Sequence, residues 1–488
     1  MMSRFAIRLR RALGRALLFA IAPAAGAQQP VTLQQAIDLA QRQSFGALAA
    51  RETREAARQR DRAFTARLLP QLTLSGDVPM YDRSIISVIQ PDGTTLFRPQ
   101  QLNQSSLNLN LNQQVPLLGA SVFVQSSLSR LQRSGQLASR TWSSTPFKIG
   151  IRQDLLRPRT QLWDSREQDV RIDAAERQYL EAREDVALQV ATAFFDFFAA
   201  QTALTNATNN AAVNDTLYTL NKGRLEVGKI GENDLLQSEL ALLRSRNSLA
   251  SARLDFDRTL AALRLQLNMP ATEPLSIAIT DVVPEIEADT AIAVAQALKN
   301  RAQMKDMELQ SMQARRQVAV ARLNNGIGAT LQASVGFNQQ GSDVDMVYRD
   351  LLNAQRVQLS VQMPLIQWGN RSAQIDAARA DMDRVEHNRR FAREQLIQEA
   401  HFAALQLQQS RDQLTISAKA DTVASKRFEV AKNRYVIGRI GIDNLYIAQN
   451  EKDQALLSYV QALRGFWTAF YRLRRVTLFD FVTGAEIR

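Results

Sequence analysis

The chain of 488 residues contains no cysteine and only two histidines. The absence of cysteine excludes disulfides and thiol chemistry within the chain. His387 and His401 are fourteen positions apart on an expected helix, about 21 Å by the helical rise, so they cannot share a metal ion. Neither a glycine-rich phosphate loop ahead of a helix nor a local Ser/His/Asp signature is present. We therefore expect neither an enzyme nor a metal or cofactor site.

Long apolar runs are also missing. Residues 1–27 hold five arginines, a short apolar run at residues 16–22 and small residues ending Ala25-Gly26-Ala27, which is the pattern of a secretory signal peptide. That run is too short to cross about 30 Å of hydrocarbon, and no later stretch of about 18 apolar residues predicts a membrane helix. The net charge of +12 falls to +7 without the five arginines. The remaining bases are scattered among acids, which argues against nucleic-acid binding.

What the chain does contain is an internal repeat. The stretch RLEVGKIGENDL at residues 224–235 returns as RYVIGRIGIDNL at residues 434–445. Both copies fit the pattern RxxxGxxGxxxL. Two glycines three apart, flanked by polar helix-forming residues, predict a tight break between two helices. The Asp and Asn residues that follow suit the first turn of the next helix. The chain is therefore interpreted as two copies of one unit.

Each half of the chain begins with a helical pattern that changes to a period of two. The clearest alternation is Leu-Asn-Leu-Asn-Leu-Asn at residues 107–112, and its counterpart is residues 357–363. Alternation of this kind predicts strands with one apolar and one wet face. The apolar face belongs either to the core of a soluble sandwich or to the lipid side of an outer-membrane barrel. Few strands in a mostly helical chain, with long polar loops on one side and short turns on the other, favour the barrel.

Two very long helical hairpins follow the strands, at about residues 164–269 and 372–474. A helix of some 65 residues would be on the order of 100 Å long, too long for a compact globule. Apolar residues at heptad spacing predict coiled-coil seams. In the second copy the seam is Leu456, Val460, Leu463, Trp467 and Phe470, and a looser seam in the first copy is Leu236, Leu240, Leu243, Ala250 and Leu254.

These patterns divide the chain into nine segments. They are residues 1–27, signal peptide; 28–70, first-half helix; 71–156, first-half membrane strands; 157–269, first long helical hairpin; 270–289, connector; 290–328, second-half helix; 329–366, second-half membrane hairpin; 367–475, second long helical hairpin; and 476–488, C-terminal tail. A sheet in lipid must leave no open edge, and closed barrels need at least about eight strands. One chain offers too few, so several chains must share one barrel.

The repeated tip pattern, the entry Leu-Leu-Pro-Gln-Leu at residues 68–72 and the exit Gln-Met-Pro-Leu at residues 362–365 resemble the TolC-type outer membrane efflux proteins. The resemblance covers nearly the whole chain after residue 27. It implies an α+β membrane protein in which a duplicated unit of long coiled-coil helices and β-hairpins forms a trimeric transmembrane β-barrel, continued by a periplasmic α-helical barrel. It further implies a homotrimer in the outer membrane, whose partners are a periplasmic adaptor and an inner-membrane transporter.

The resemblance also assigns roles to residues. The adaptor-docking tips are Val227, Gly228, Lys229, Gly231, Ile437, Gly438, Arg439 and Gly441. Asp443 and Tyr435 gate the aperture, and a second acidic ring position falls on Tyr446 and is lost. If the strands form a membrane barrel, the alternation places Leu107, Leu109, Leu111, Val357, Leu359 and Val361 toward lipid, and Asn108, Asn110, Asn112, Gln358, Ser360 and Gln362 toward a wet lumen.

Several alternatives remain open at this stage. The family usually has four strands in each chain, whereas residues 121–128 and 147–156 look like a further hairpin, which would give about eighteen strands in a trimer, still within the range known for such barrels. The exported substrate, and drug efflux against type I protein secretion, are invisible in the sequence. The competing class is a periplasmic coiled-coil scaffold with a small soluble sheet.

Overall fold

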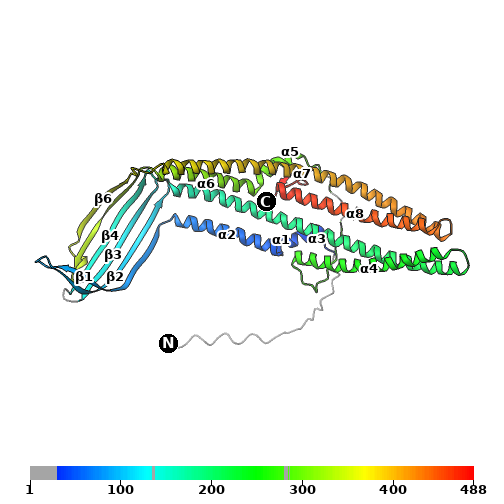
Figure 1. Ribbon diagram of the computed structural model, residues 1–488, viewed down its shortest axis with the longest axis horizontal. Coiled ribbons are helices and arrows are strands. Elements are labelled where there is room, and N and C mark those ends of the chain that lie inside the picture. The colour runs from blue at the N-terminus through cyan, green and yellow to red at the C-terminus, as the bar shows by residue number, and fades with distance from the viewer. Residues whose placement is uncertain (1–29, 135–137, 280–283, 285, 488) are drawn as a thin grey trace, which may run out of the picture.

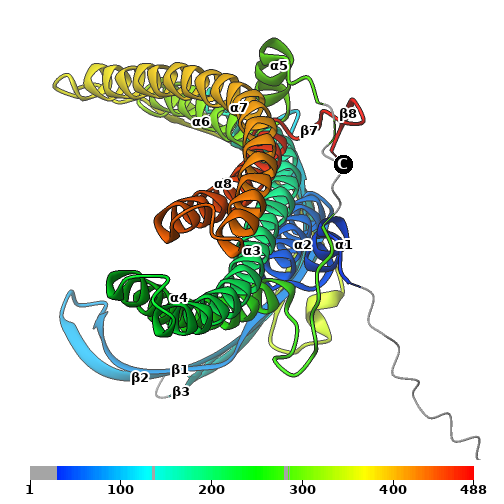
Figure 2. The ribbon, with the colours of Figure 1, turned by 90° about the vertical axis from the view of Figure 1, so that its right-hand side faces the viewer.

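A computed structural model describes residues 30–134, 138–279, 284 and 286–487. The expected signal peptide at residues 1–27 and part of the expected connector lie outside these residues. The protein is elongated, with a sheet at one end and two helical hairpins that reach the other end (Figure 1). Between these ends the helices lie side by side along an open curve (Figure 2).

Six antiparallel strands form one sheet in the order of the sequence. Their bounds are β1 (Gln71–Ile89), β2 (Thr95–Val115), β3 (Ala120–Ser134), β4 (Ser139–Leu155), β5 (Gly328–Gly341) and β6 (Leu352–Gln362). The first half of the chain therefore contributes four strands and the second half two, which answers the open question of four or six strands in favour of six. At 11 to 21 residues every strand reaches the 9 to 11 residues that a membrane crossing requires.

The helix that opens each half is broken in the middle, which the sequence analysis did not expect. The first-half pair is α1 (Leu33–Gln43) and α2 (Phe45–Arg67), and the second-half pair is α5 (Thr290–Asn300) and α6 (Ala302–Asn324). The breaks fall at Ser44 and Arg301, both buried and both with extended backbone, at ψ 152° and 134°. The Ser44 hydroxyl caps α2 by accepting from the backbone N–H of Ala47, as an N-cap serine does.

The long hairpins consist of α3 (Thr160–Glu226) with α4 (Glu232–Leu267), and α7 (Asn370–Val436) with α8 (Ile442–Thr477). Helix α3 packs against both α4 and α8, and α8 packs against α7. The lateral order is therefore α4, α3, α8, α7, which leaves α4 and α7 at the two edges. A short hairpin of β7 (Phe479–Asp480) and β8 (Ala485–Glu486) ends the described chain.

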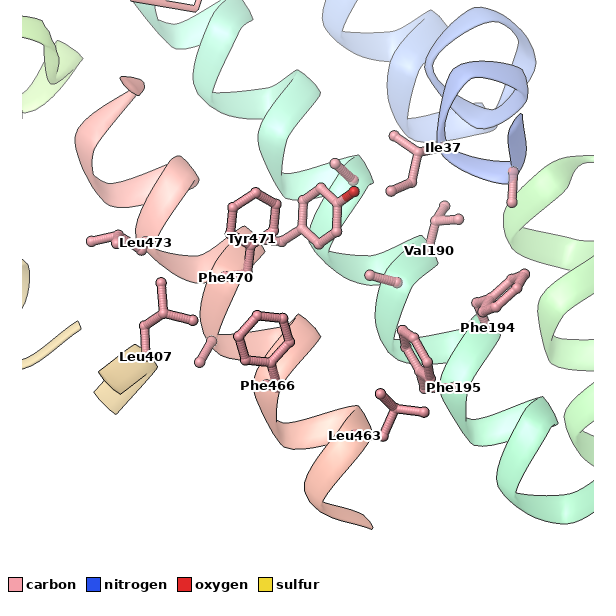
Figure 3. Close-up of a cluster of buried hydrophobic side chains, with 14 of the residues drawn as sticks. Ile37, Val190, Phe194, Phe195, Leu407, Leu463, Phe466, Phe470, Tyr471 and Leu473 are labelled. Atoms are coloured by element: carbon pink, nitrogen blue, oxygen red, sulfur yellow. The ribbon is translucent and has the colours of Figure 1, made fainter. Parts of the chain in front are cut away.

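The main hydrophobic core lies halfway along the helices, where α1, α3, α7 and α8 meet (Figure 3). Aromatic rings dominate this cluster: Phe194, Phe195 and Phe466 are fully buried, and Trp467 stacks on Phe195 with ring centroids 6.2 Å apart. The expected second-copy seam is part of the core, since Val460, Leu463 and Phe470 are buried in it or beside it. These contacts fix α8 against α3.

The expected first-copy seam is wrong as a contact within the chain. Leu240, Leu243 and Leu254 are 47%, 56% and 70% exposed. Helix α4 instead buries Ser238, Leu242 and Ser245. These residues also have heptad spacing, but they lie on a different face of the helix from the leucines. The two serine hydroxyls donate to helix carbonyls one turn back, at 2.7 and 2.8 Å, so their burial leaves no hydroxyl unsatisfied. A heptad stripe predicts a helix partner but not which helix supplies it.

One described helix, α3, contains an 18-residue window with mean hydropathy of 1.2, which by length and composition could cross a membrane. By that measure the expectation of no such segment is wrong. The window is 44% buried inside the single chain, and α3 supplies Val190, Phe194 and Phe195 to the main core. Burial in a helical core accounts for its apolar composition.

Candidate functional site

The two copies of the glycine pattern form nearly identical turns at the end of the protein farthest from the sheet (Figure 1). In the first copy the N–H groups of Gly228 and Lys229 donate to the carbonyls of Leu225 and Arg224, each at 2.9 Å. In the second copy Gly438 and Arg439 make the equivalent bonds at 3.0 and 2.9 Å. This paired pattern is the Schellman ending of a helix, which requires a left-handed residue.

The two glycines of each tip have different reasons to be glycine. Gly228 and Gly438 have φ of 71° and 73°, a region that strains residues with a Cβ. Gly231 and Gly441 have ordinary φ of −84° and −72°, and a Cβ at either position would meet nothing within 4 Å. Nothing within the single chain requires glycine at the second position, so the backbone there is open to close approach from outside.

All eight residues expected at the docking tips are exposed. The two apolar ones, Val227 and Ile437, are 67% and 66% exposed. Lys229 and Arg439 follow them on the same turns and also face solvent. The tips therefore present two adjacent apolar and basic surfaces built on the same backbone geometry.

A contact network joins α3 to α7 just above the tips. Tyr435 is buried, and its hydroxyl donates to the side-chain carbonyl of Asn221 at 2.6 Å. The Arg224 guanidinium donates to the carbonyl of Val436 at 2.9 Å and lies 5.1 Å from the centre of the Tyr435 ring. Arg224 and Asn221 were not singled out from the sequence for this role. Arg224 belongs to the repeated pattern. Asn221 does not, because its counterpart in the second copy is Ala431.

Asp443 lies exposed in the first turn of α8 and lines a cleft of about 680 Å³ between α3, α4 and α8. A carboxylate in this turn is favoured by the helix dipole. Tyr446 lines the same cleft. It occupies the position at which the resemblance would place a second acidic ring residue. Burial, followed by the nearby Tyr435, raises the pKa of Tyr446 to about 12, so it stays neutral. Asp443 is thus the acidic group of this turn.

Further acidic character in the cleft comes from Asp453, which the sequence analysis did not single out. Its carboxylate accepts hydrogen bonds from the amides of Asn206 and Asn210 at 2.8 and 2.6 Å, and the Lys452 ammonium lies 3.2 Å away. Asn206, Asn210 and Asn214 recur every four residues along α3 and line the cleft. The four-residue spacing of these asparagines could have predicted a polar stripe on one face of the helix from the sequence.

The sheet has two chemically distinct faces, and the strand register aligns them across all six strands. Pairs such as Leu74 with Leu109, Val124 with Ile149 and Ala333 with Val357 place apolar side chains side by side. The apolar face consists of Leu72, Leu74, Leu107, Leu109, Leu111, Val122, Val124, Phe147, Ile149, Ile151, Ala333, Val335, Phe337, Val357, Leu359 and Val361. The six residues expected to face lipid all belong to it.

The opposite face is polar. It carries the six residues expected to face a lumen, Asn108, Asn110, Asn112, Gln358, Ser360 and Gln362, and in addition Gln125, Lys148, Arg152, Gln332 and Ser334. The apolar face is not covered by any described helix: Leu74, Leu359 and Val361 are 70%, 60% and 62% exposed. An exposed apolar face of this extent indicates a surface made for lipid or for another protein.

No group of three or more His, Asp or Glu side chains that could hold a metal ion occurs among the described residues. The described functional features are thus two exposed tips, a polar cleft between helices, and a sheet with one apolar and one polar face.

Comparison with known proteins agrees with this architecture. Residues 293–477 match the family model of the outer membrane efflux proteins, so the predicted resemblance to this family is confirmed. No curated protein sequence matches the chain.

Solved structures share the fold of nearly the whole chain at low sequence identity. The CmeC outer membrane channel of Campylobacter jejuni is 17% identical with a TM-score of 0.67, over 93% of this chain and 86% of that one. The outer membrane protein VceC of Vibrio cholerae is 15% identical with a TM-score of 0.65, over 93% and 97% of the two chains. The open MtrE outer membrane channel of Neisseria gonorrhoeae is 16% identical with a TM-score of 0.62, over 93% and 90%.

Substitution at the two kinds of tip glycine should have different effects. Gly228→Ala or Gly438→Ala forces a Cβ into left-handed backbone and should weaken its turn by about 1–2 kcal/mol. Gly231→Ala and Gly441→Ala should leave the turns unchanged, because the backbone is ordinary and the space is open. Hydrogen exchange of the tip amides measures the difference. Equal protection in the two pairs of variants would contradict this description of the turns.

Proposed function

We propose that this outer membrane efflux protein is the protomer of a channel that crosses the outer membrane through its strands and extends into the periplasm through its helices. The observation that carries the proposal is the exposed apolar face that extends across all six strands of the sheet. In the outer membrane that face lies against lipid, and the polar face lines a water-filled lumen. A periplasmic scaffold with a soluble sheet would need an element to cover the apolar face, and no described helix does so.

The edges of the sheet support a homotrimer. Strands β1 and β6 are the outermost strands, and unpaired backbone groups on them would cost several kcal/mol each in hydrocarbon. Pairing of β6 of one protomer with β1 of the next satisfies both edges. Three protomers of six strands close a barrel of about eighteen strands, an even number within the range of outer-membrane barrels.

The helices support the same closure below the membrane. Helix α4 exposes Leu236, Leu240, Leu243 and Leu254 along one stripe. Helix α7, at the opposite edge, exposes Ile416, Val423 and Val430 at intervals of seven. These two stripes have the spacing of coiled-coil partners. In the trimer, α4 of one protomer packs against α7 of its neighbour, and the leucines of α4 acquire the partner that is missing within the chain.

The tips give the channel its partners, a periplasmic adaptor and, through it, an inner-membrane transporter. Support comes from two identical turns with exposed Val227 and Ile437, each followed by a basic residue. Gly231 and Gly441 leave open backbone beside them, so a helical hairpin of the adaptor can approach closely. The same architecture serves drug efflux and type I protein secretion, and the channel conducts what its transporter delivers.

The entrance is held closed by the network around Tyr435, and Asp443 adds negative charge at the mouth. The Tyr435 hydroxyl is bonded to Asn221 across two helices that belong to different repeats. Opening by relative movement of the α7–α8 hairpin and α3 must break this bond. Tyr435 is therefore a positioning residue for the closed state, and Asp443 is a charge that permeating ions meet.

Arginine at two adjacent positions of β2 tests the membrane assignment. Leu109→Arg places a charge on the lipid face and should cost roughly 2 to 4 kcal/mol near mid-depth. Asn108→Arg, its matched control on the lumen face, should have little effect because water reaches it. The yield of trimers resistant to SDS in outer-membrane fractions measures both. Equal yields from the two variants, or a soluble protein that needs no detergent, would favour the scaffold.

Cross-linking tests the docking tips. Because the chain has no cysteine, Lys229→Cys provides a unique attachment site at a tip, and Arg60→Cys on α2 provides a control near the sheet. We expect a purified periplasmic adaptor to cross-link at position 229 and not at position 60. Adding Gly231→Trp and Gly441→Trp should abolish the product, because the indole fills the open space. A product that persists in this variant would contradict docking at the tips.

Single-channel recording tests the gate. Tyr435→Phe removes a buried hydrogen bond worth about 1 kcal/mol, which shifts the opening equilibrium about fivefold toward the open state. Tyr348→Phe, an exposed tyrosine in the loop before β6, serves as the control. Unchanged opening in Tyr435→Phe would exclude the proposed gating role.

A further inference from the structure

The polar face of the sheet is uneven in charge. On β4 it carries Lys148 and Arg152, and on β6 it carries Arg356. The register places Gly150, between the two β4 cations, opposite Ser334, and Ser334 opposite Arg356. Residues two apart on a strand are about 6.8 Å apart, and neighbouring strands are about 4.8 Å apart. Lys148, Arg152 and Arg356 thus form one basic patch within a short stretch of the wall.

Small residues surround these three cations. Gly150, Ser334 and Gly336 lie between them on the same face. The ring of Phe123 occupies the space above Gly150, where a Cβ would lie 2.4 Å from the ring. The Lys148 ammonium is 6.0 Å from the centre of that ring, which suits a cation–π contact. The small residues thus leave room between the cations, and the Phe123 ring fills the space over Gly150.

Little negative charge offsets the basic patch. Asp154 is the acid that follows on the same face of β4, and it accepts a hydrogen bond from the hydroxyl of Thr330 at 3.0 Å. At the periplasmic end of the wall the Arg157 guanidinium lies against Gly328 and donates to Gln362 at 3.2 Å, adding a further cation. Within the described part of the chain, no ion pair involves Lys148, Arg152 or Arg356.

The other half of the wall is neutral at the same depth. At the register position of Lys148 the residues on this face of β1 to β3 are Thr73, Asn110 and Gln125, and further along β1 the same face carries Asp77. The charge is therefore concentrated on β4 to β6, and two of its three cations belong to β4, a strand of the hairpin that exceeds the usual four strands of the family. The additional hairpin widens the barrel and also changes its electrostatics.

We propose that the basic patch is an anion-selecting site in the outer-membrane section of the channel, which favours solutes that carry carboxylate or phosphate groups. The inference rests on the proposed channel function. In a trimer the patch repeats around the lumen, opposite in sign to Asp443 at the periplasmic mouth. At 0.1 M ionic strength the field of each cation extends about 10 Å, and at 1 M about 3 Å. The selectivity is therefore strongest in dilute salt.

Reversal potentials in a KCl gradient across planar lipid bilayers test the proposal. The test compares the full chain carrying Asp443→Ala with the same chain that also carries Lys148→Gln, Arg152→Gln and Arg356→Gln. Removing Asp443 in both proteins takes away the opposing cation preference that this acid gives the mouth. We expect the chloride-to-potassium permeability ratio to fall about twofold or more near 0.1 M salt, and the difference to shrink near 1 M.

Arg140→Gln is the matched control, because Arg140 lies on the same strand and pairs with Gln132 on the opposite face of the sheet. It should leave the permeability ratio unchanged. If the triple variant does not assemble, Arg152→Gln alone should shift the ratio in the same direction. Channels that conduct with an unchanged ratio in the variants would overturn the anion-selecting site. An absence of conductance in every protein, including Asp443→Ala alone, would contradict the channel function itself.

Discussion

The whole architecture depends on the backbone hydrogen bonds at the two edges of the sheet. A six-stranded sheet with one apolar face is stable in lipid only when β1 and β6 find partners, because no water is present there to satisfy their amides and carbonyls. A single chain cannot supply these partners. Closure through neighbouring copies then fixes the positions of the helices, since β1 follows α2, β4 leads into α3 and β6 leads into α7. The exposed leucine stripe of α4 is explained by the same closure.

The two repeats share their backbone and differ in their side chains, and the proposed functional roles depend on these differences. The tips are superimposable in their hydrogen bonds, which gives an adaptor two equivalent surfaces. The proposed gate is not duplicated: Tyr435 has Leu225 as its counterpart, and its partner Asn221 has Ala431. Strand β4, in the first half of the chain, also carries Lys148 and Arg152 on the polar face, whereas β5, the first strand of the second half, carries no charged residue. Duplication thus provides the common backbone, and divergence provides the Tyr435–Asn221 bond and the basic patch on which the proposed gate and the proposed anion-selecting site depend.

Much of this fold could be predicted from the sequence because its signals are local. Alternation at residues 107–112 and heptads along α8 report directly on which face of an element is apolar. The breaks at Ser44 and Arg301 were not predicted, because no proline marks them and both residues are buried against other helices. The sequence predicted the α4 stripe but not its partner, since a heptad pattern does not identify the second helix.

In the candidate site, too, local features were predictable from the sequence and long-range contacts were not. The left-handed glycines of the tips follow from spacing alone, whereas the bonds of Arg224 to Val436 and of Tyr435 to Asn221 join positions more than two hundred residues apart. The basic patch needs the strand register, because Arg356 comes beside Lys148 and Arg152 only through β5. Contacts between residues this far apart in the sequence cannot be predicted from any single segment.

Imaging of the detergent-extracted protein, with class averages viewed end-on and side-on, tests the central claim most directly. Closure of three sheets into one barrel predicts a hollow tube with threefold symmetry, with the tips of the helical hairpins at the end opposite the membrane. Separate rods, or a particle that stays soluble without detergent, would contradict the account.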